Sequence, residues 1–80
     1  MMLDFRYIMK KSSSKELGSK LYEVRIEKGF DQKFVAKKLG CNQSFISKIE
    51  NGDIEPKIRF FLKLIKLYSK PIEYFSGVLE

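Results

Sequence analysis

The residues best suited to recognition chemistry are the polar residues of segment 43–50, namely Gln43, Ser44, Ser47 and Lys48. A glutamine side chain can pair with N6 and N7 of adenine, a lysine can reach O6 or N7 of guanine, and a serine can contact a base or a phosphate. Taken singly, Gln43 and Ser44 could be ordinary first-turn residues, and Lys48 an ordinary solvated lysine. Their use therefore depends on the elements that position them.

Two short helices, of residues 32–39 and 43–50, are predicted on either side of a glycine. Asp31 and Asn42 are suitable N-caps for them. Gly40 stands where the chain must reverse with positive φ, and Ala36 is small enough for a close helix crossing. The apolar residues expected to face inward and hold the crossing angle are Val35, Leu39, Ile46 and Ile49.

The remaining chain predicts three more helices. Ser13 and Glu16 can form a capping box that starts a helix of about residues 14–28, with Leu17, Leu21 and Val24 on its apolar face. Pro56 suits the first position of a helix that continues to about residue 69, and Pro71 opens a last short one. The fold class expected is therefore all-α, a bundle of five short helices.

For residues 1–13, which precede the helical domain of residues 14–80, the sequence pattern predicts an N-terminal arm rather than a helix. Their apolar residues alternate with a period close to two, which is typical of a strand or an extended arm. A lone strand is not stable. The arm could pair with its twin in a dimer, pack on the helical domain or be disordered.

Composition excludes several classes of protein. The 80 residues fit one domain, and no disulfide, zinc site or His-based catalysis is possible within a chain that has one cysteine, Cys41, and no histidine. Apolar runs are too short to span a membrane, and we expect a cytoplasmic protein. No cofactor or small-molecule ligand is evident, and an enzyme is not expected. The formal net charge of +6 favours a polyanionic partner.

The sequence resembles the Cro/cI-type, or lambda repressor-like (XRE-type), helix-turn-helix family of phage repressors and bacterial regulators. The segments that carry the resemblance are "LGSKLYEVRIEKGF", "VAKKLG", "SFISKIENG" and "PIEYF". The resemblance covers residues of about 16–75. It implies a five-helix DNA-binding bundle that acts in transcription regulation, with helix 43–50 in the major groove of double-stranded DNA. It also implies a homodimer on a palindromic operator.

By position in this family, Gln32 resembles a phosphate anchor. Asn51 and the backbone that follows it resemble a second phosphate clamp, which Lys57 or Arg59 could extend. Arg25 and Glu50 match an ion pair that joins the first helix to the end of the third. Phe45 could pack on the bundle or touch a thymine methyl group. The DNA-binding set is Gln32, Asn42, Gln43, Ser44, Ser47, Lys48, Asn51 and Lys57; the structural set is Arg25, Ala36, Gly40, Ile46 and Glu50.

The helix expected over residues 56–69 is apolar on two faces, which predicts that part of it meets another element or another subunit. The predicted dimer interface is Phe60, Leu64, Leu67, Ile72, Phe75, Val78 and Leu79. The sequence departs from the family at Lys57, where a serine or threonine is common, and at Ser69, where glycine is frequent. An antitoxin-like or adaptor module that binds another protein is the alternative function.

Overall fold

The first helix is longer than the sequence pattern indicates. In the computed structural model, which describes the backbone of residues 2–79 and the side chains of residues 14–78, α1 spans Met2–Lys28. The expected arm or strand over residues 2–13 is wrong, and Ser13 lies inside the helix rather than at its cap. No glycine or proline precedes Gly18, and a helix satisfies the backbone hydrogen bonds within the segment itself, which a strand without a partner cannot do. The domain boundary at residue 13 stays a prediction.

The second and third helices agree with the sequence prediction in bounds and caps. Helix α2 spans Gln32–Leu39 and α3 spans Gln43–Glu50. The side chain of Asp31 accepts from the amide of Phe34 at 2.8 Å, and that of Asn42 accepts from the amide of Phe45 at 3.1 Å. Gly40 has φ 72° and ψ 34°, which confirms the left-handed turn between the helices.

The C-terminal helices begin later than predicted. Helix α4 spans Ile58–Leu67, so Pro56 precedes it by two residues, and Lys57 is an N-cap without a side-chain hydrogen bond. Pro71 precedes a 3-10 helix, η1 (Ile72–Phe75), which continues into α5 (Ser76–Leu79). Ser69 has φ 57° where glycine is frequent in the resembled family. A non-glycine residue adopts this left-handed conformation at a cost of about 1 kcal/mol.

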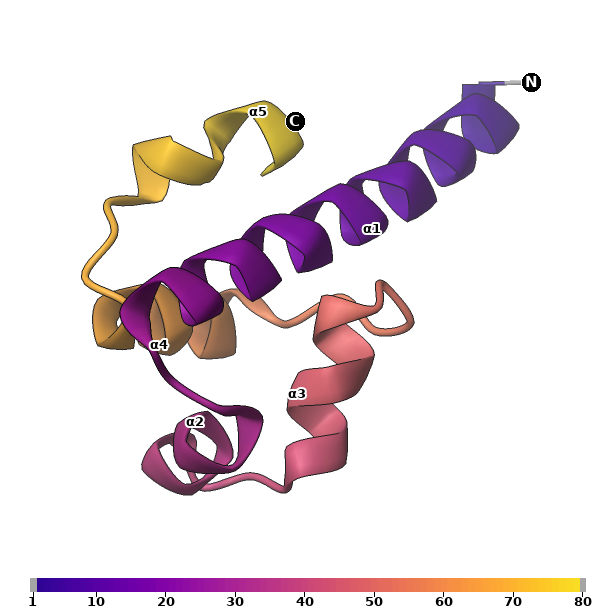
Figure 1. The fold of residues 1–80 in the computed structure, drawn as a ribbon. Coiled ribbons are helices and arrows are strands. Elements are labelled where there is room, and N and C mark those ends of the chain that lie inside the picture. Colours follow the sequence, from indigo (N-terminus) through magenta and orange to yellow (C-terminus); the bar gives the residue numbers. More distant parts are fainter. Residues whose placement is uncertain (1, 80) are drawn as a thin grey trace.

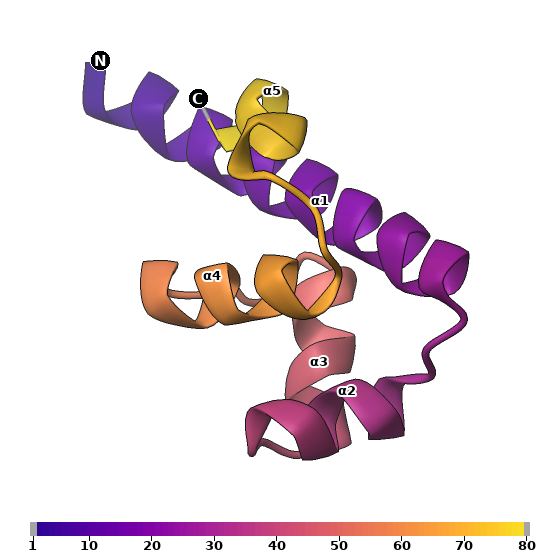
Figure 2. The same ribbon diagram turned by 90° about the vertical axis from the view of Figure 1, so that its left-hand side faces the viewer.

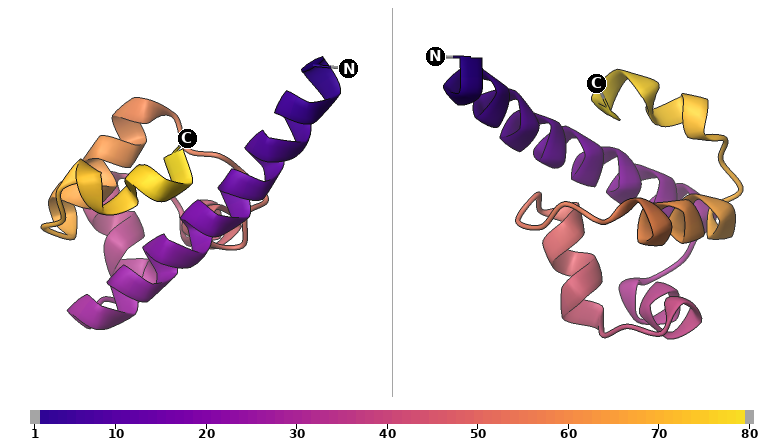
Figure 3. Two further views of the ribbon diagram at one scale, coloured as in Figure 1. Left: turned by 90° about the horizontal axis from the view of Figure 1, so that it is seen from above. Right: turned by 180° about the vertical axis from the view of Figure 1, so that it is seen from behind.

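The elements are arranged around α1, which crosses the molecule (Figure 1). Figures 2 and 3 show η1 and α5 on one side of α1, with α2, α3 and α4 on the other. The core between them contains side chains from all six of these helical elements; its largest fully buried members are Tyr68, Phe75, Leu21, Ile46, Ile49, Leu64, Val24 and Val35. The described residues thus form an all-α bundle without strands, as predicted.

Candidate nucleic-acid interface

The angle between α2 and α3 is set by buried side chains on their facing sides. Val35 and Ala36 of α2 are buried, as are Ile46 and Ile49 of α3, and the backbone N–H of Cys41 donates to the carbonyl of Ala36 at 3.0 Å. Leu39, which was also expected to face inward, is half-buried and packs against the core, whereas Phe34 of the same helix is exposed. These apolar and backbone contacts join the two helices into one unit.

The polar side of α3 remains accessible. Gln43, Ser44 and Lys48 are exposed and Ser47 is half-buried. Asn42 and Asn51, which flank the helix, are exposed as well, but the Asn42 carboxamide already caps α3 and accepts from the Ser44 hydroxyl at 3.0 Å. The structure therefore brings the predicted recognition residues together on the exposed side of α3 and at its ends.

The remaining predicted phosphate contacts lie around α3 rather than on it. Gln32 is half-buried at the start of α2, while Lys57 and Arg59 are exposed at the start of α4. Asn51 is the C-cap of α3, and the backbone N–H groups of Gly52 and Asp53 are already bonded to carbonyls of Ile49 and Lys48. A phosphate clamp here would therefore rely on side chains.

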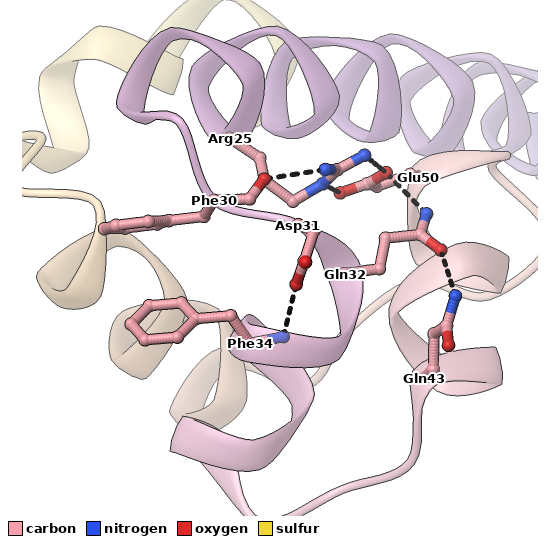
Figure 4. A network of polar contacts seen from close by, with 7 residues as sticks. All are labelled: Arg25, Phe30, Asp31, Gln32, Phe34, Gln43 and Glu50. Atoms are coloured by element: carbon pink, nitrogen blue, oxygen red, sulfur yellow. Dashed lines mark hydrogen bonds and ion pairs between the residues drawn. The ribbon is translucent and has the colours of Figure 1, made fainter.

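A chain of side-chain hydrogen bonds connects the interior to the exposed face of α3 (Figure 4). Nε2 of Gln43 donates to Oε1 of Gln32 at 3.3 Å, and Nε2 of Gln32 donates to Oε1 of Glu50 at 3.0 Å. Gln32 is therefore hydrogen-bonded to Gln43, a predicted base-contacting residue, and also occupies the position where a phosphate anchor is expected. The sequence does not reveal this link, because the two glutamines are eleven residues apart.

The predicted ion pair between Arg25 and Glu50 is present and buried. Nε and Nη2 of Arg25 donate to the two carboxylate oxygens at 2.7 and 3.0 Å, and Nη1 donates to the Phe30 carbonyl at 2.9 Å. The side chains are 7% and 4% exposed. The hydrogen bonds to Glu50 raise the pKa of the Arg25 guanidinium above its ordinary value, against an opposing effect of burial. The pair ties α1 and the segment before α2 to the end of α3.

Gly18 is a structural residue that the sequence prediction missed. It lies in α1 against the end of α3, and an added Cβ would overlap the carbonyl oxygen of Ile49 and lie 2.6 Å from that of Glu50. At Gly52, an added Cβ would lie 2.8 Å from Cα of Lys15. The end of α3 therefore meets α1 backbone to backbone. The available signal was an isolated glycine next to Leu17 inside a helical pattern, where glycine costs about 1 kcal/mol relative to alanine.

Two residues near the interface have packing roles. Phe45 is half-buried, and its ring contacts that of Phe60 edge-on, with centroids 5.1 Å apart. Of the two roles left open for Phe45, this contact supports packing. Cys41 is also half-buried and packs against the core, and burial raises the pKa of its thiol. A raised thiol pKa makes the reactive thiolate scarcer, so Cys41 is suited to packing rather than to redox chemistry.

Tyr68, the C-cap of α4, places a hydroxyl group in the core. Its side chain is fully buried, and its hydroxyl is the buried side-chain polar atom without a hydrogen-bond partner among residues 14–78. Burial raises the pKa of Tyr68 above its ordinary value; the charge of Glu50 adds to this shift and that of Arg25 opposes it. A buried hydroxyl without a partner lowers stability because it has lost its hydrogen bonds to water.

We therefore expect Tyr68→Phe to raise the free energy of unfolding by about 1 kcal/mol, since the ring stays and only the unpaired hydroxyl leaves. Urea denaturation followed by circular dichroism would measure it. Tyr74→Phe, which changes a tyrosine that is 38% exposed, is the control and should leave stability unchanged. A loss of stability in Tyr68→Phe alone would show that the hydroxyl has a partner in solution.

The structure corrects part of the predicted dimer interface. Leu64, Phe75 and Val78 lie in the core of the single chain, because α4 and η1 pack against each other and α1, so they offer little surface to a partner. Phe60 and Leu67 are half-buried, Ile72 is 41% exposed, and the side chain of Leu79 lies outside the described residues. The most exposed large apolar residues of α4 are instead Ile58 and Leu62, at 61% and 44%.

The part of the chain that the structure describes contains no helix long and apolar enough to cross a membrane. Among the same residues, no group of three or more His, Cys, Asp or Glu side chains could hold a metal ion.

Comparison with known proteins agrees with this geometry. The sequence profile of a family described as helix-turn-helix matches residues 21–75. Over 60 residues, which are 74% of this chain, the sequence is 37% identical to the HTH-type transcriptional regulator PuuR of Escherichia coli (strain K12), and equally to that of Shigella flexneri. The matching segment is 32% of the length of each regulator.

Proposed function

This chain belongs to the Cro/cI-type helix-turn-helix family, and from that premise we propose that it is a sequence-specific DNA-binding transcriptional regulator. The observation that carries the proposal is the exposed polar side of α3, with Gln43, Ser44 and Lys48, on a rigid unit with α2. Helix α3 would lie in the major groove, with Gln43 on a base edge.

Phosphate contacts would orient the bundle on the duplex. Gln32 is the first residue of α2, the helix before α3, and Lys57 is the N-cap of α4, the helix after it. The net charge of +6 also favours binding of a polyanion. Such contacts supply affinity without sequence preference and weaken as salt is added. Discrimination between sequences would come from α3.

The active form would be a homodimer on a palindromic operator, with half-sites about 34 Å apart. The exposed apolar side chains of Ile58, Leu62 and Ile72 support such an association, because a second subunit would remove them from water. Ile72 belongs to the interface predicted from the sequence, whereas Ile58 and Leu62 take the place of its buried residues.

Selection of bound duplexes from a random DNA pool, with the mass of the complex measured by light scattering, tests the proposal. We expect a palindromic site bound by two chains. Enrichment of no site, or equal retention of every duplex, would refute it and favour the protein-interaction module instead.

We expect Gln43→Ala to weaken binding to the selected site by about 1–3 kcal/mol and to leave binding to random duplex nearly unchanged, because a base contact carries sequence preference and a phosphate contact does not. Fluorescence anisotropy with both duplexes would measure the two affinities. Equal losses on both would show that Gln43 contacts the DNA backbone.

A further inference from the structure

Glu50 lies between the buried ion pair and the exposed face of α3. Its Oε1 accepts from Nη2 of Arg25 and from Nε2 of Gln32, each at 3.0 Å, and its Oε2 accepts from Nε of Arg25 at 2.7 Å. A carboxylate in an ion pair can only accept hydrogen bonds. Gln32 must therefore turn its NH₂ group toward Glu50 and its oxygen away from it.

The orientation of Gln32 in turn decides that of Gln43. The oxygen of Gln32 can only accept, and it receives Nε2 of Gln43 at 3.3 Å (Figure 4). One N–H of Gln43 is used in this bond, so its second N–H and its Oε1 remain. A glutamine that recognises adenine needs one donor for N7 and one acceptor for the N6 amino group. The remaining atoms of Gln43 are this pair.

We propose that Glu50 is a positioning residue for base recognition, which fixes the amide orientation of Gln43 through Gln32. The proposal rests on the proposed function of α3. Rotating a carboxamide by 180° hardly changes its shape but exchanges donor and acceptor. Packing alone therefore selects poorly between the two orientations. The carboxylate of Glu50, at the buried end of this series of hydrogen bonds, can only accept and so selects one orientation. The Glu50 side chain is 4% exposed, so water has little access to replace it in this role.

Glu50→Gln tests the proposal directly, because a glutamine can donate or accept and no longer dictates the orientation of Gln32. The readout is the ratio of affinities for operators that differ at the base where Gln43→Ala loses discrimination. We expect this ratio to fall about fivefold or more in Glu50→Gln. Both affinities come from one preparation, so an unfolded fraction cancels in the ratio.

Arg25→Lys is the matched control. It weakens the same ion pair but keeps the carboxylate, so we expect discrimination to be retained even if stability falls. Equal losses of discrimination in Arg25→Lys and Glu50→Gln would assign the effect to general loosening and overturn the proposal. An unchanged ratio in Glu50→Gln would overturn it as well.

A measurement without DNA separates this proposal from the proposed function. In nuclear magnetic resonance spectra of the free protein, we expect Gln32→Ala to shift the side-chain amide signals of Gln43, while Lys33→Ala at the neighbouring exposed residue leaves them unchanged. Unshifted Gln43 signals in Gln32→Ala would refute the chain of hydrogen bonds. Shifted signals in a protein that selects no DNA would refute the proposed function, and the base-reading role with it.

Discussion

Gly18→Ala is expected to lower the free energy of unfolding by about 3 kcal/mol or more. The new Cβ would overlap the carbonyl oxygen of Ile49 and lie 2.6 Å from that of Glu50. These are backbone atoms of α3, so no side chain can rotate away, and the whole helix would have to move from α1. Inserting a methyl group into a close-packed contact usually costs about 1–3 kcal/mol, and backbone on the opposing side places this site at or above that range.

Urea denaturation of both proteins would measure the loss. Gly77→Ala is the matched control, because an added Cβ meets nothing within 4 Å there and Gly77 lies in helix α5. A helical glycine without close neighbours should gain about 0.5–1 kcal/mol on replacement by alanine. If the two variants proved equally stable, α1 and α3 would be farther apart in solution than in the structure.

Arg25→Met is expected to lower the free energy of unfolding by about 3–5 kcal/mol. Methionine keeps much of the apolar stem of the side chain but leaves the Glu50 carboxylate buried without a positive partner. It also removes the donor to the Phe30 carbonyl, which joins α1 to the segment before α2. The cost arises from the unpaired charge rather than from the strength of the ion pair itself.

The double variant Arg25→Met with Glu50→Leu distinguishes these two causes. Because it leaves no unpaired charge, we expect it to recover much of the stability lost by Arg25→Met, as buried ion pairs replaced by apolar residues often do. Lys28→Met, at an exposed position of α1, is the control for loss of positive charge and should have little effect. A loss below about 1 kcal/mol in Arg25→Met would mean that water reaches Glu50.

Local sequence signals were sufficient for the α2–α3 unit. Asp31 and Asn42 act as N-caps through their own side chains, and Gly40 takes the left-handed turn because it lacks a Cβ. Each of these features depends on a few neighbouring residues. Local signals misled at residues 2–13, where apolar alternation indicated a strand although no partner strand exists in the described residues to pair with it.

The sequence by itself determined the all-α class, the bounds of α2 and α3, and the polar residues on α3, because periodicity, caps and a turn glycine are local properties. Resemblance to a family supplied the Arg25–Glu50 pair. Only the tertiary structure decided that Leu64, Phe75 and Val78 are core rather than interface. It alone brought Gly18 against the backbone of α3 and joined Gln43 through Gln32 to Glu50. These contacts join residues distant in the chain, and their geometry exists only after the helices have packed.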